Sequence, residues 1–283
     1  MKRNRKVKIL ATLGPASSDE AMIRKLHEAG ADLFRINMSH SSHEMLRTLI
    51  QRIRSVEAAC GRPIGILADL QGPKLRVGKF AETTVELKAG QTFTLDSNEA
   101  PGDATRVYLP HPEILESVKP GDRLLIDDGK LHLKAVKCDG KTIVTEVVSG
   151  TKISDRKGVS LPDTILATGV LTDKDRADVA VGCEVGVDFY ALSFVREAAD
   201  VYALRTLLAQ HESKAHIISK IEDQSAIEHL GSILEATDAL MVARGDLGIE
   251  IPYETLPLIQ RRAVAMAIAC RKPVIVATHM LES

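Results

Sequence analysis

The sequence predicts an α/β protein: an incomplete (β/α)8 barrel of seven strands, interrupted by a small all-β domain. Two patterns support this prediction. At both ends of the chain, short β-branched runs alternate with amphipathic helical stretches, which implies parallel strands joined by right-handed crossovers. Between residues 74 and 170, strand-like segments separated by turns replace this alternation. The predicted domains are the first part of the barrel (1–73), the inserted β-rich domain (74–170) and the second part of the barrel (171–283).

Three strands are expected before the insertion, at residues 8–14, 33–39 and 65–69, with helices between them at 18–29 and 43–59. The first helix should begin at a serine cap and carry acidic residues in its first turn. The second helix has apolar residues at helical spacing, which predicts that one face is buried. That face consists of Leu46, Leu49, Ile50, Ile53 and Val56.

The insertion is expected to contain only strands and turns. Turn signals separate its strands at Ala89-Gly90, Pro120-Gly121, Asp128-Gly129 and Asp139-Gly140. The expected strands are 84–87, 91–95, 123–126, 130–136 and 141–148.

After the insertion the βα alternation returns and brings the number of barrel strands to seven. The expected helices are 173–181, 197–210, 224–236 and 253–270, and the expected strands are 189–194, 216–221, 239–242 and 273–278. A complete barrel of this type has eight strands. A seventh helix and an eighth strand would be expected beyond the last residue, so we interpret the sequence as a truncated barrel.

Composition limits the possible partners and the location. The 283 residues carry a net charge of −1, which gives no bulk reason to expect binding to nucleic acid or to an anionic membrane. Aromatic residues make up 3% and there is no Trp, so the core should be aliphatic. The four cysteines form no CxxC pair, which is typical of reduced thiols. With no apolar run near 18 residues and no signal peptide, we expect a cytoplasmic protein.

Polar residues follow successive barrel strands, where a parallel barrel places its active site. A single strand-end Arg, Lys or Asp is usually a salt-bridge partner or a helix cap. Here five successive strands end in charged or hydroxyl groups, which indicates a functional site. These groups are Arg35, Asn37, Ser39 and His40, then Asp69 and Lys74, then Ser193, then Lys220 and Glu222, and then Arg244 and Asp246; Thr278 follows the seventh strand.

The chemistry of these groups points to phosphate and a divalent cation. Glu222 and Asp246 offer carboxylate oxygens suited to Mg²⁺. Lys220 lies two residues before Glu222 on a strand, so both side chains face the same way, and an ammonium there suits a migrating phosphoryl group. Arg35 adds a planar fork for phosphate oxygens. Backbone N–H groups at 245–248 suit a small carboxylate. No GxxxxGK[ST] motif is present, which excludes a P-loop.

The chain resembles the pyruvate kinase family over nearly its whole length, in the order and the spacing of its motifs. The segments that carry the resemblance are KILATLGPAS, FRINMSH, GPKLRVG, IDDGK, KGVSLP, ALSFVREAADV, IISKIED, LMVARGDLGIEIP and KPVIVATHMLES. The resemblance implies transfer of phosphate from phosphoenolpyruvate to ADP, giving pyruvate and ATP. It also implies Mg²⁺ or Mn²⁺ as cofactor and an inserted domain that closes as a lid.

The same resemblance assigns roles to individual residues. Arg35 matches the phosphate-contacting arginine, and Lys220 the lysine that stabilises the phosphoryl group and the enolate. Glu222 and Asp246 match the metal ligands. Gly245, Asp246 and Thr278 match the substrate-contacting set, with Thr278 on the proton route. The nucleotide side is matched by Asn37, His40, Arg76 and Lys157, and the monovalent-cation region by Asn37, Ser39, Asp69 and Leu70.

Two departures from the family pattern are informative. Potassium-dependent members read DTKGPEIR after the third strand, whereas this chain has Leu70 in place of the Thr and Lys74 in place of the Glu. Leu70 offers no side-chain oxygen to K⁺, and Lys74 can supply the missing charge, so we expect no K⁺ requirement. His279 stands where the family usually has Gln.

Two other functions remain open from the sequence. One is a Mg²⁺-dependent lyase or aldolase acting on pyruvate-like enolates, which would need neither the insertion nor Arg76 and Lys157. The other is a non-catalytic or inactive fragment of the same family. The family is homotetrameric, and its C-terminal interface domain is not part of this sequence.

Overall fold

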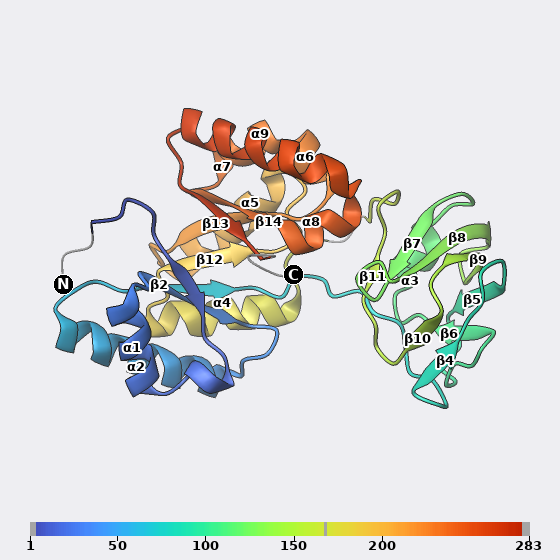
Figure 1. Ribbon diagram of the computed structural model, residues 1–283, viewed down its shortest axis with the longest axis horizontal. Coiled ribbons are helices and arrows are strands. Elements are labelled where there is room, and N and C mark those ends of the chain that lie inside the picture. Colours follow the sequence, from blue (N-terminus) through green and yellow to red (C-terminus); the bar gives the residue numbers. More distant parts are fainter. Residues whose placement is uncertain (1–3, 167–168, 279–283) are drawn as a thin grey trace.

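The computed structural model describes residues 4–166 and 169–278 and contains a curled sheet of seven parallel strands (Figure 1). The strand order is β1-β2-β3-β12-β13-β14-β15. Within the described residues β1 and β15 each pair on one side only, so the sheet stays open between them. This confirms the prediction of an incomplete barrel. The strands are β1 (Leu10–Thr12), β2 (Leu33–Asn37), β3 (Gly65–Asp69), β12 (Phe189–Leu192), β13 (His216–Ile221), β14 (Ala239–Ala243) and β15 (Val274–Ala277).

Helices cover the outer face of this sheet and bury its main aliphatic core. In Figure 1, α1, α2 and α4 lie below the sheet, while α5, α6, α7 and α9 lie above it. The predicted apolar face of α2 is buried as expected. The helices are α1 (Glu20–Ala29), α2 (His43–Cys60), α4 (Asp173–Val185), α5 (Ala198–Gln210), α6 (Gln224–Glu228), α7 (Leu230–Ala236), α8 (Arg244–Glu250) and α9 (Leu256–Ala269), with 3-10 turns at Pro15–Ser17 and Tyr253–Thr255.

The first helix begins later than predicted. A 3-10 turn precedes α1, and the Ser18 hydroxyl donates to the Pro15 carbonyl within that turn. Asp19 is the cap instead, since its carboxylate accepts a hydrogen bond from the Met22 N–H at 2.9 Å. The helix therefore starts at Glu20 rather than at residue 18.

Two further helices differ from prediction because of tertiary contacts. α4 continues past Gly182 to Val185. Gly182 does not end the helix; it leaves room for Tyr190, whose ring occupies the space that a side chain at Gly182 would need. The helix predicted at 224–236 is divided into α6 and α7 at His229, which leaves helical geometry with φ −95° and ψ 13°. None of the helices in residues 4–166 and 169–278 combines the length and apolar composition that crossing a bilayer would need.

The inserted segment folds around its own aliphatic core, separate from that of the barrel. The glycines at the four predicted turns all have positive φ, between 78° and 102°. A short helix, α3 (Pro112–Ser117), was not predicted; it is only six residues long and buries Ile114 and Leu115 in this core. The strands are β4 (Thr84–Glu86), β5 (Thr92–Asp96), β6 (Arg106–Tyr108), β7 (Arg123–Ile126), β8 (Leu131–Cys138), β9 (Thr142–Ser149), β10 (Lys152–Ser154) and β11 (Val159–Ser160).

The interior of the curled sheet has a second, small apolar layer, as barrels of this type do. The interior layer consists of Leu67, Ala191, Ile218, Ala239 and Met241.

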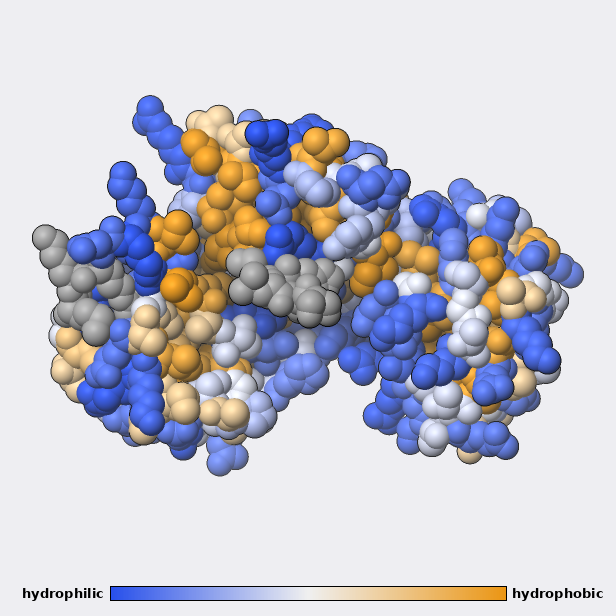
Figure 2. All heavy atoms as spheres, viewed as in Figure 1, coloured by the Kyte–Doolittle hydropathy of each residue, from blue (hydrophilic) through white to orange (hydrophobic). Residues whose placement is uncertain are grey.

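Figure 2 shows the barrel body and the inserted body joined on one side and separated by an open notch on the other.

Candidate active site

The next interior layer of the sheet is polar. Side chains alternate between the two faces of a strand. Two residues beyond the apolar layer on β3, β12 and β13 come Asp69, Ser193 and Lys220. The β12–β13 register places Ser193 beside Lys220, since Leu192 pairs with Ser219. Asp69 pairs with Ala191, two residues before Ser193, and its carboxylate reaches Lys220 Nζ at 3.4 Å. The sheet therefore gathers at one edge the groups that the sequence placed at strand ends.

Lys220 forms the centre of this layer. Its Nζ lies 2.7 Å from Glu222 Oε1 and 3.4 Å from Asp69 Oδ1, and it donates to Ser193 Oγ at 2.8 Å. Burial alone would lower the pKa of Lys220, but the Glu222 and Asp69 carboxylates outweigh it and raise the pKa above its usual value. Lys220 is thus a fixed, charged ammonium in a largely water-excluded position, with 12% of its side chain exposed.

Glu222 is buried and held from two sides. Its Oε1 faces Lys220, and its Oε2 accepts the backbone N–H of Phe194 at 2.7 Å. Burial raises the pKa of Glu222, Lys220 acts against this rise, and Asp246 adds to it. Phe194 has a left-handed backbone with φ 56°. Such a conformation is uncommon for a residue other than glycine and tends to occur at functional sites.

Arg35 and Asp69 form a buried ion pair beside Lys220. Arg35 contacts Asp69 Oδ2 through Nε at 2.6 Å and through Nη2 at 2.5 Å, and its Nη1 donates to Thr12 Oγ1 at 3.1 Å. Asp69 Oδ1 is a buried oxygen with no hydrogen bond among the described residues, although Lys220 Nζ lies 3.4 Å away. Asp69 therefore has acceptor capacity to spare.

The residues after β2 and β3 occupy the same edge. Asn37 pairs with Asp69 in the β2–β3 register, and its Oδ1 accepts the Ser39 N–H at 3.0 Å. Leu70 is buried, with its N–H donating to the Ala191 carbonyl. His40 is exposed on the turn that follows.

Thr278 and Gly245 meet at the end of the sixth and seventh strands. The Gly245 N–H donates to Thr278 Oγ1 at 2.8 Å, and Arg244 donates from Nε and Nη2 to the Thr278 carbonyl. Thr278 has φ 62°, a second left-handed residue at a strand end. Gly245 and Asp246 lie in the first turn of α8, as the expected helix start requires. His279 lies outside the described residues.

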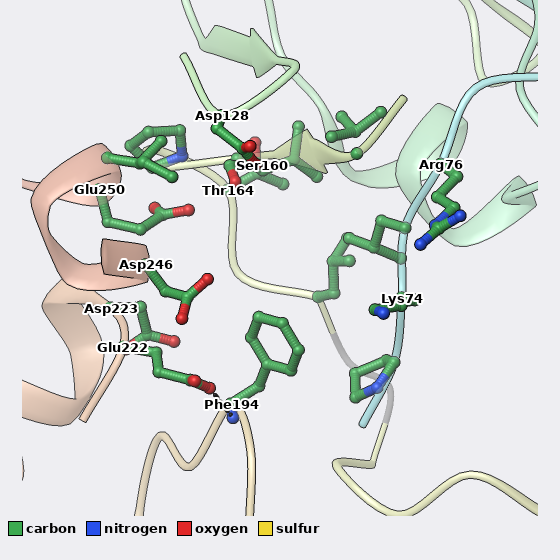
Figure 3. A pocket seen from close by; sticks show the side chains of 18 of the residues that line it. Lys74, Arg76, Asp128, Ser160, Thr164, Phe194, Glu222, Asp223, Asp246 and Glu250 are labelled. Carbon is green, nitrogen blue, oxygen red and sulfur yellow. Dashed lines mark hydrogen bonds between the residues drawn. The ribbon is translucent and has the colours of Figure 1, made fainter. Parts of the chain in front are cut away.

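A cavity of about 590 Å³ separates this edge from the inserted domain, a volume typical of small-molecule sites. Figure 3 shows carboxylates on one wall and the cations Lys74 and Arg76 on the other, with Phe194 between them. The labelled carboxylates of the barrel wall are Glu222, Asp223, Asp246 and Glu250.

The cationic wall carries the remaining predicted residues. Burial lowers the pKa of Lys74. Repulsion from Arg76 and Lys220 lowers it further, and the Asp246 and Asp69 carboxylates offset part of the fall. Lys157 also lines the cavity and pairs with Asp127 at 2.8 Å. Lys74 and Arg76 thus lie across the cavity from the barrel carboxylates (Figure 3), while Lys157 lines it together with carboxylates of the insertion, Asp127, Asp128 and Asp155.

Sequence reasoning assigned no role to Ser193, Glu250 or Asp223. Ser193 follows a strand and was noted only as a strand end. Glu250 lies four residues after Asp246, a spacing that places both on one face of α8. Burial raises the pKa of Glu250 to about 7, and the nearby Asp223 adds to this rise.

The barrel wall suits a hard divalent cation. Mg²⁺ is usually held by one or two carboxylates together with substrate oxygens and water. Glu222 and Asp246 line the cavity from neighbouring strands. Among residues 4–166 and 169–278, no three His, Cys, Asp or Glu side chains converge in a metal cage, and His43 pairs with Asp178 instead. The donor set therefore fits Mg²⁺ or Mn²⁺.

Comparisons with known proteins identify relatives of this chain. A family model described as pyruvate kinase, barrel domain, matches residues 4–283. A pyruvate kinase of Methylorubrum extorquens is 50% identical over 283 residues, which are 100% of this chain and 59% of that protein. A pyruvate kinase of Mycobacterium tuberculosis is 42% identical over 279 residues, 99% of this chain and 59% of that protein.

A solved structure shares the fold. The crystal structure of a pyruvate kinase from Cryptosporidium parvum superposes with a TM-score of 0.94 at 33% identity, covering 98% of this chain and 58% of that one. The chain thus spans 59% of the length of the curated relatives named above. Because the match runs through both parts of the barrel and through the inserted segment alike, the chain belongs to the pyruvate kinase family.

Proposed function

We propose that this chain carries the phosphoryl-transfer site of a pyruvate kinase, which converts phosphoenolpyruvate and ADP to pyruvate and ATP. The observation that supports this most is the cluster of Lys220, Glu222 and Asp69 at the strand ends. Glu222 of this cluster lines a cavity that Lys74, Arg76 and Lys157 line from the other side. The transfer breaks the bond from the enol oxygen to phosphorus and forms one from phosphorus to a terminal ADP oxygen. The remaining enolate then takes up a proton at carbon.

Lys220 and Arg35 stabilise the charge that moves in this reaction. The raised pKa of Lys220 keeps its ammonium charged, and fixed cations in a water-excluded site act strongly on a phosphoryl group and an enolate. Arg35 is held by Asp69 and Thr12, so its fork is oriented before substrate arrives. It contacts the phosphate.

Glu222 and Asp246 hold a divalent cation, Mg²⁺ or Mn²⁺. When bound, the cation neutralises charge on the substrate and on the transferring group. Burial raises the pKa of Glu222 and Lys220 opposes this rise, while the Phe194 N–H orients the carboxylate.

Gly245, Asp246 and Thr278 form the substrate-contacting set. The Thr278 hydroxyl oxygen accepts the Gly245 N–H, so its own proton points elsewhere and can take part in the proton route to the enolate carbon. The left-handed backbone at Thr278 is consistent with a position selected for function rather than for strand geometry.

The region of Asn37, Ser39, Asp69 and Leu70 is where potassium-dependent relatives hold a monovalent cation. Here Lys74 substitutes for that cation. Support comes from the Asp69 and Asp246 carboxylates, which offset part of the fall that burial causes in the pKa of Lys74.

ADP lies between the barrel edge and the inserted domain, bounded by Asn37, His40, Arg76 and Lys157. The insertion, which we place at residues 74–170, acts as a lid that excludes water during transfer. A Mg²⁺-dependent lyase would have no use for the cationic wall, so ADP binding separates the two functions.

A coupled pyruvate-formation assay on the purified 283-residue chain, run alongside size-exclusion chromatography, tests the proposal. We expect turnover that requires phosphoenolpyruvate, ADP and Mg²⁺ together. A folded chain that binds ADP without turnover would indicate an inactive member of the family.

A further inference from the structure

One buried carboxylate ties the two connections of the inserted domain to each other. Asp175 lies in the first turn of α4 and is 0% exposed. Its Oδ1 accepts the N–H groups of Gln71 at 2.9 Å and Gly72 at 3.2 Å, just after β3 on the outgoing connection. Its Oδ2 accepts the N–H and the hydroxyl of Thr172, at 3.0 and 2.6 Å, where the chain returns. Both oxygens are thus engaged twice.

Helix capping does not account for this arrangement. The next helix, α5, begins with a capping box of the same kind, in which Asp200 occupies the position of Asp175. Asp200 accepts the N–H groups of Arg196 and Glu197, which immediately precede its own helix. The bonds from Asp175 to Gln71 and Gly72 cross more than 100 residues of sequence and add nothing to the cap of α4.

The outgoing connection packs directly against the residues that follow β12, beside the cluster of Lys220, Glu222 and Asp69. Gly72 is buried with φ 64°, and a Cβ there would lie 2.7 Å from Phe194 Cδ2 and 3.2 Å from Ser193 Cβ. Phe194 donates its N–H to Glu222, and Ser193 accepts from Lys220. The contacts therefore run from Asp175 through Gly72 to the end of β12 and on to the catalytic cluster.

We propose that Asp175 is a positioning residue that fixes both connections of the inserted domain and thereby the placement of Lys74, two residues beyond Gly72. The inference rests on the proposed function, because placement of Lys74 affects catalysis only if the cavity hosts the reaction. Without the carboxylate, the N–H groups of Gln71 and Gly72 lose their acceptor, which is costly for buried donors. Misplacement of a catalytic group by about 1 Å can cost up to ~10²-fold in rate.

Hydrogen exchange of the unmodified chain is the first test and needs no turnover. The Gln71 and Gly72 amides lie outside any strand, yet they should exchange as slowly as the amides of β3. Exchange at the rate of the exposed turn at 139–141 would overturn the proposal.

Two variants separate positioning from capping. Asp175→Ala removes both sets of bonds, while the control Thr172→Val removes the hydroxyl from the cap and leaves the bonds to Gln71 and Gly72 intact. We expect faster exchange at residues 70–77 in Asp175→Ala alone. We also expect its kcat to fall about ten-fold with little change in KM for phosphoenolpyruvate, since a displaced Lys74 acts on the transfer step.

Equal exchange at 70–77 in the two variants, or an equal loss of kcat, would show that Asp175 serves only the helix and would overturn the proposal. If exchange responds as expected while the unmodified chain forms no pyruvate, Asp175 still fixes the connections and it is the proposed function that fails. If Asp175→Ala does not fold, the exchange rates of Gln71 and Gly72 in the unmodified chain decide.

Discussion

The two walls of the cavity differ in their balance of charge and in how firmly the charges are held. Carboxylates predominate on the barrel wall, whereas the opposite wall carries both cations and carboxylates. On the barrel wall, Glu222 is 2% exposed and Lys220 12%, and both are hydrogen-bonded within the sheet edge. On the opposite wall, Lys157 is 37% exposed and its pairing partner Asp127 belongs to the same inserted domain. Coulomb attraction between two charges grows as water is excluded, so the charges of the buried barrel wall are held more firmly than the exposed Lys157.

This difference assigns distinct tasks to the two bodies. Groups that must act on developing charge are best fixed before substrate binds, and the parallel sheet does this by bringing Asp69 and Ser193 to Lys220 at one edge. In the proposed function a nucleotide enters and leaves, so the wall that would contact it is better carried on a separate body. Substitutions on the barrel wall should therefore reduce the rate of chemistry more than those on the inserted wall.

Lys220→Met should have the largest effect. The variant keeps an unbranched side chain of similar length but loses the ammonium, so kcat should fall by at least ~10²-fold, as for loss of an oxyanion donor. Steady-state kinetics with the coupled assay measures this. Lys214→Met is the control, since Lys214 is exposed just before the other end of β13. Turnover near the unmodified rate in a folded Lys220→Met variant would contradict the assignment.

Asp246→Asn should weaken binding of the divalent cation. The amide supplies one neutral oxygen in place of a charged carboxylate, and we expect Mn²⁺ affinity to fall by about ten-fold or more. Electron paramagnetic resonance of free Mn²⁺ measures it without turnover. Asp238→Asn, at the opposite end of β14, should lower stability, since Asp238 accepts the Ile217 N–H, but leave Mn²⁺ binding unchanged. An unaffected Mn²⁺ affinity in Asp246→Asn would place the cation elsewhere.

The barrel wall was also the more predictable of the two from sequence. Each βα unit carries its own periodicity, so the strands and the buried face of α2 follow from local pattern, and strand ends then locate Lys220 and Glu222. The inserted domain was less predictable, because α3 is only six residues long and is stabilised by burial of Ile114 and Leu115. Hydrophobic periodicity in the sequence does not reveal a short helix that is stabilised by tertiary packing.

The same limit applies to single residues. From the sequence, Asp175 has the position of an ordinary helix cap. Only the fold shows that it also accepts the N–H groups of Gln71 and Gly72, more than 100 residues away. Glu250 reads as a surface carboxyl until burial and Asp223 raise its pKa. In both cases the decisive neighbours come from other elements of the fold, and no local pattern encodes them.

Glu250 lies where the two walls meet. Replacing it in Glu250→Gln should change how the free energy of unfolding depends on pH. The pKa of Glu250 is about 7 in the folded chain, against an ordinary 4.5, so between these values the native state binds a proton that the unfolded chain lacks. This stabilisation is complete below about pH 4.5 and is lost as pH rises through about 7. Its magnitude should be on the order of 3 kcal/mol.

Urea unfolding at pH 5, 6.5 and 8 measures this contribution. The unmodified chain should lose more stability over this range than Glu250→Gln, because the amide does not titrate. Ser160 of the inserted domain hydrogen-bonds Glu250, and Arg123 and Asp163 of that domain lie near it, so the pH dependence reports on the contact between the two bodies. Glu254→Gln, four residues further along and exposed, should leave the pH dependence as it is. Parallel curves for the unmodified chain and Glu250→Gln would remove Glu250 from this role.

The smallest expected effect concerns K⁺, because in our proposal the ammonium of Lys74 supplies the positive charge that K⁺ supplies in potassium-dependent relatives. In tetramethylammonium buffer, adding K⁺ should change the rate by less than about two-fold, or ~0.4 kcal/mol in the barrier. Lys74→Glu restores the acidic residue of those relatives and should make the rate rise with K⁺, whereas Lys79→Glu, an exposed lysine on the same segment, should not. A collapse of the unmodified enzyme's rate in tetramethylammonium, restored by K⁺, would show that Lys74 leaves the cation site unfilled. The positive charge at the transfer site would then have to come from solution rather than from the connection that Asp175 holds.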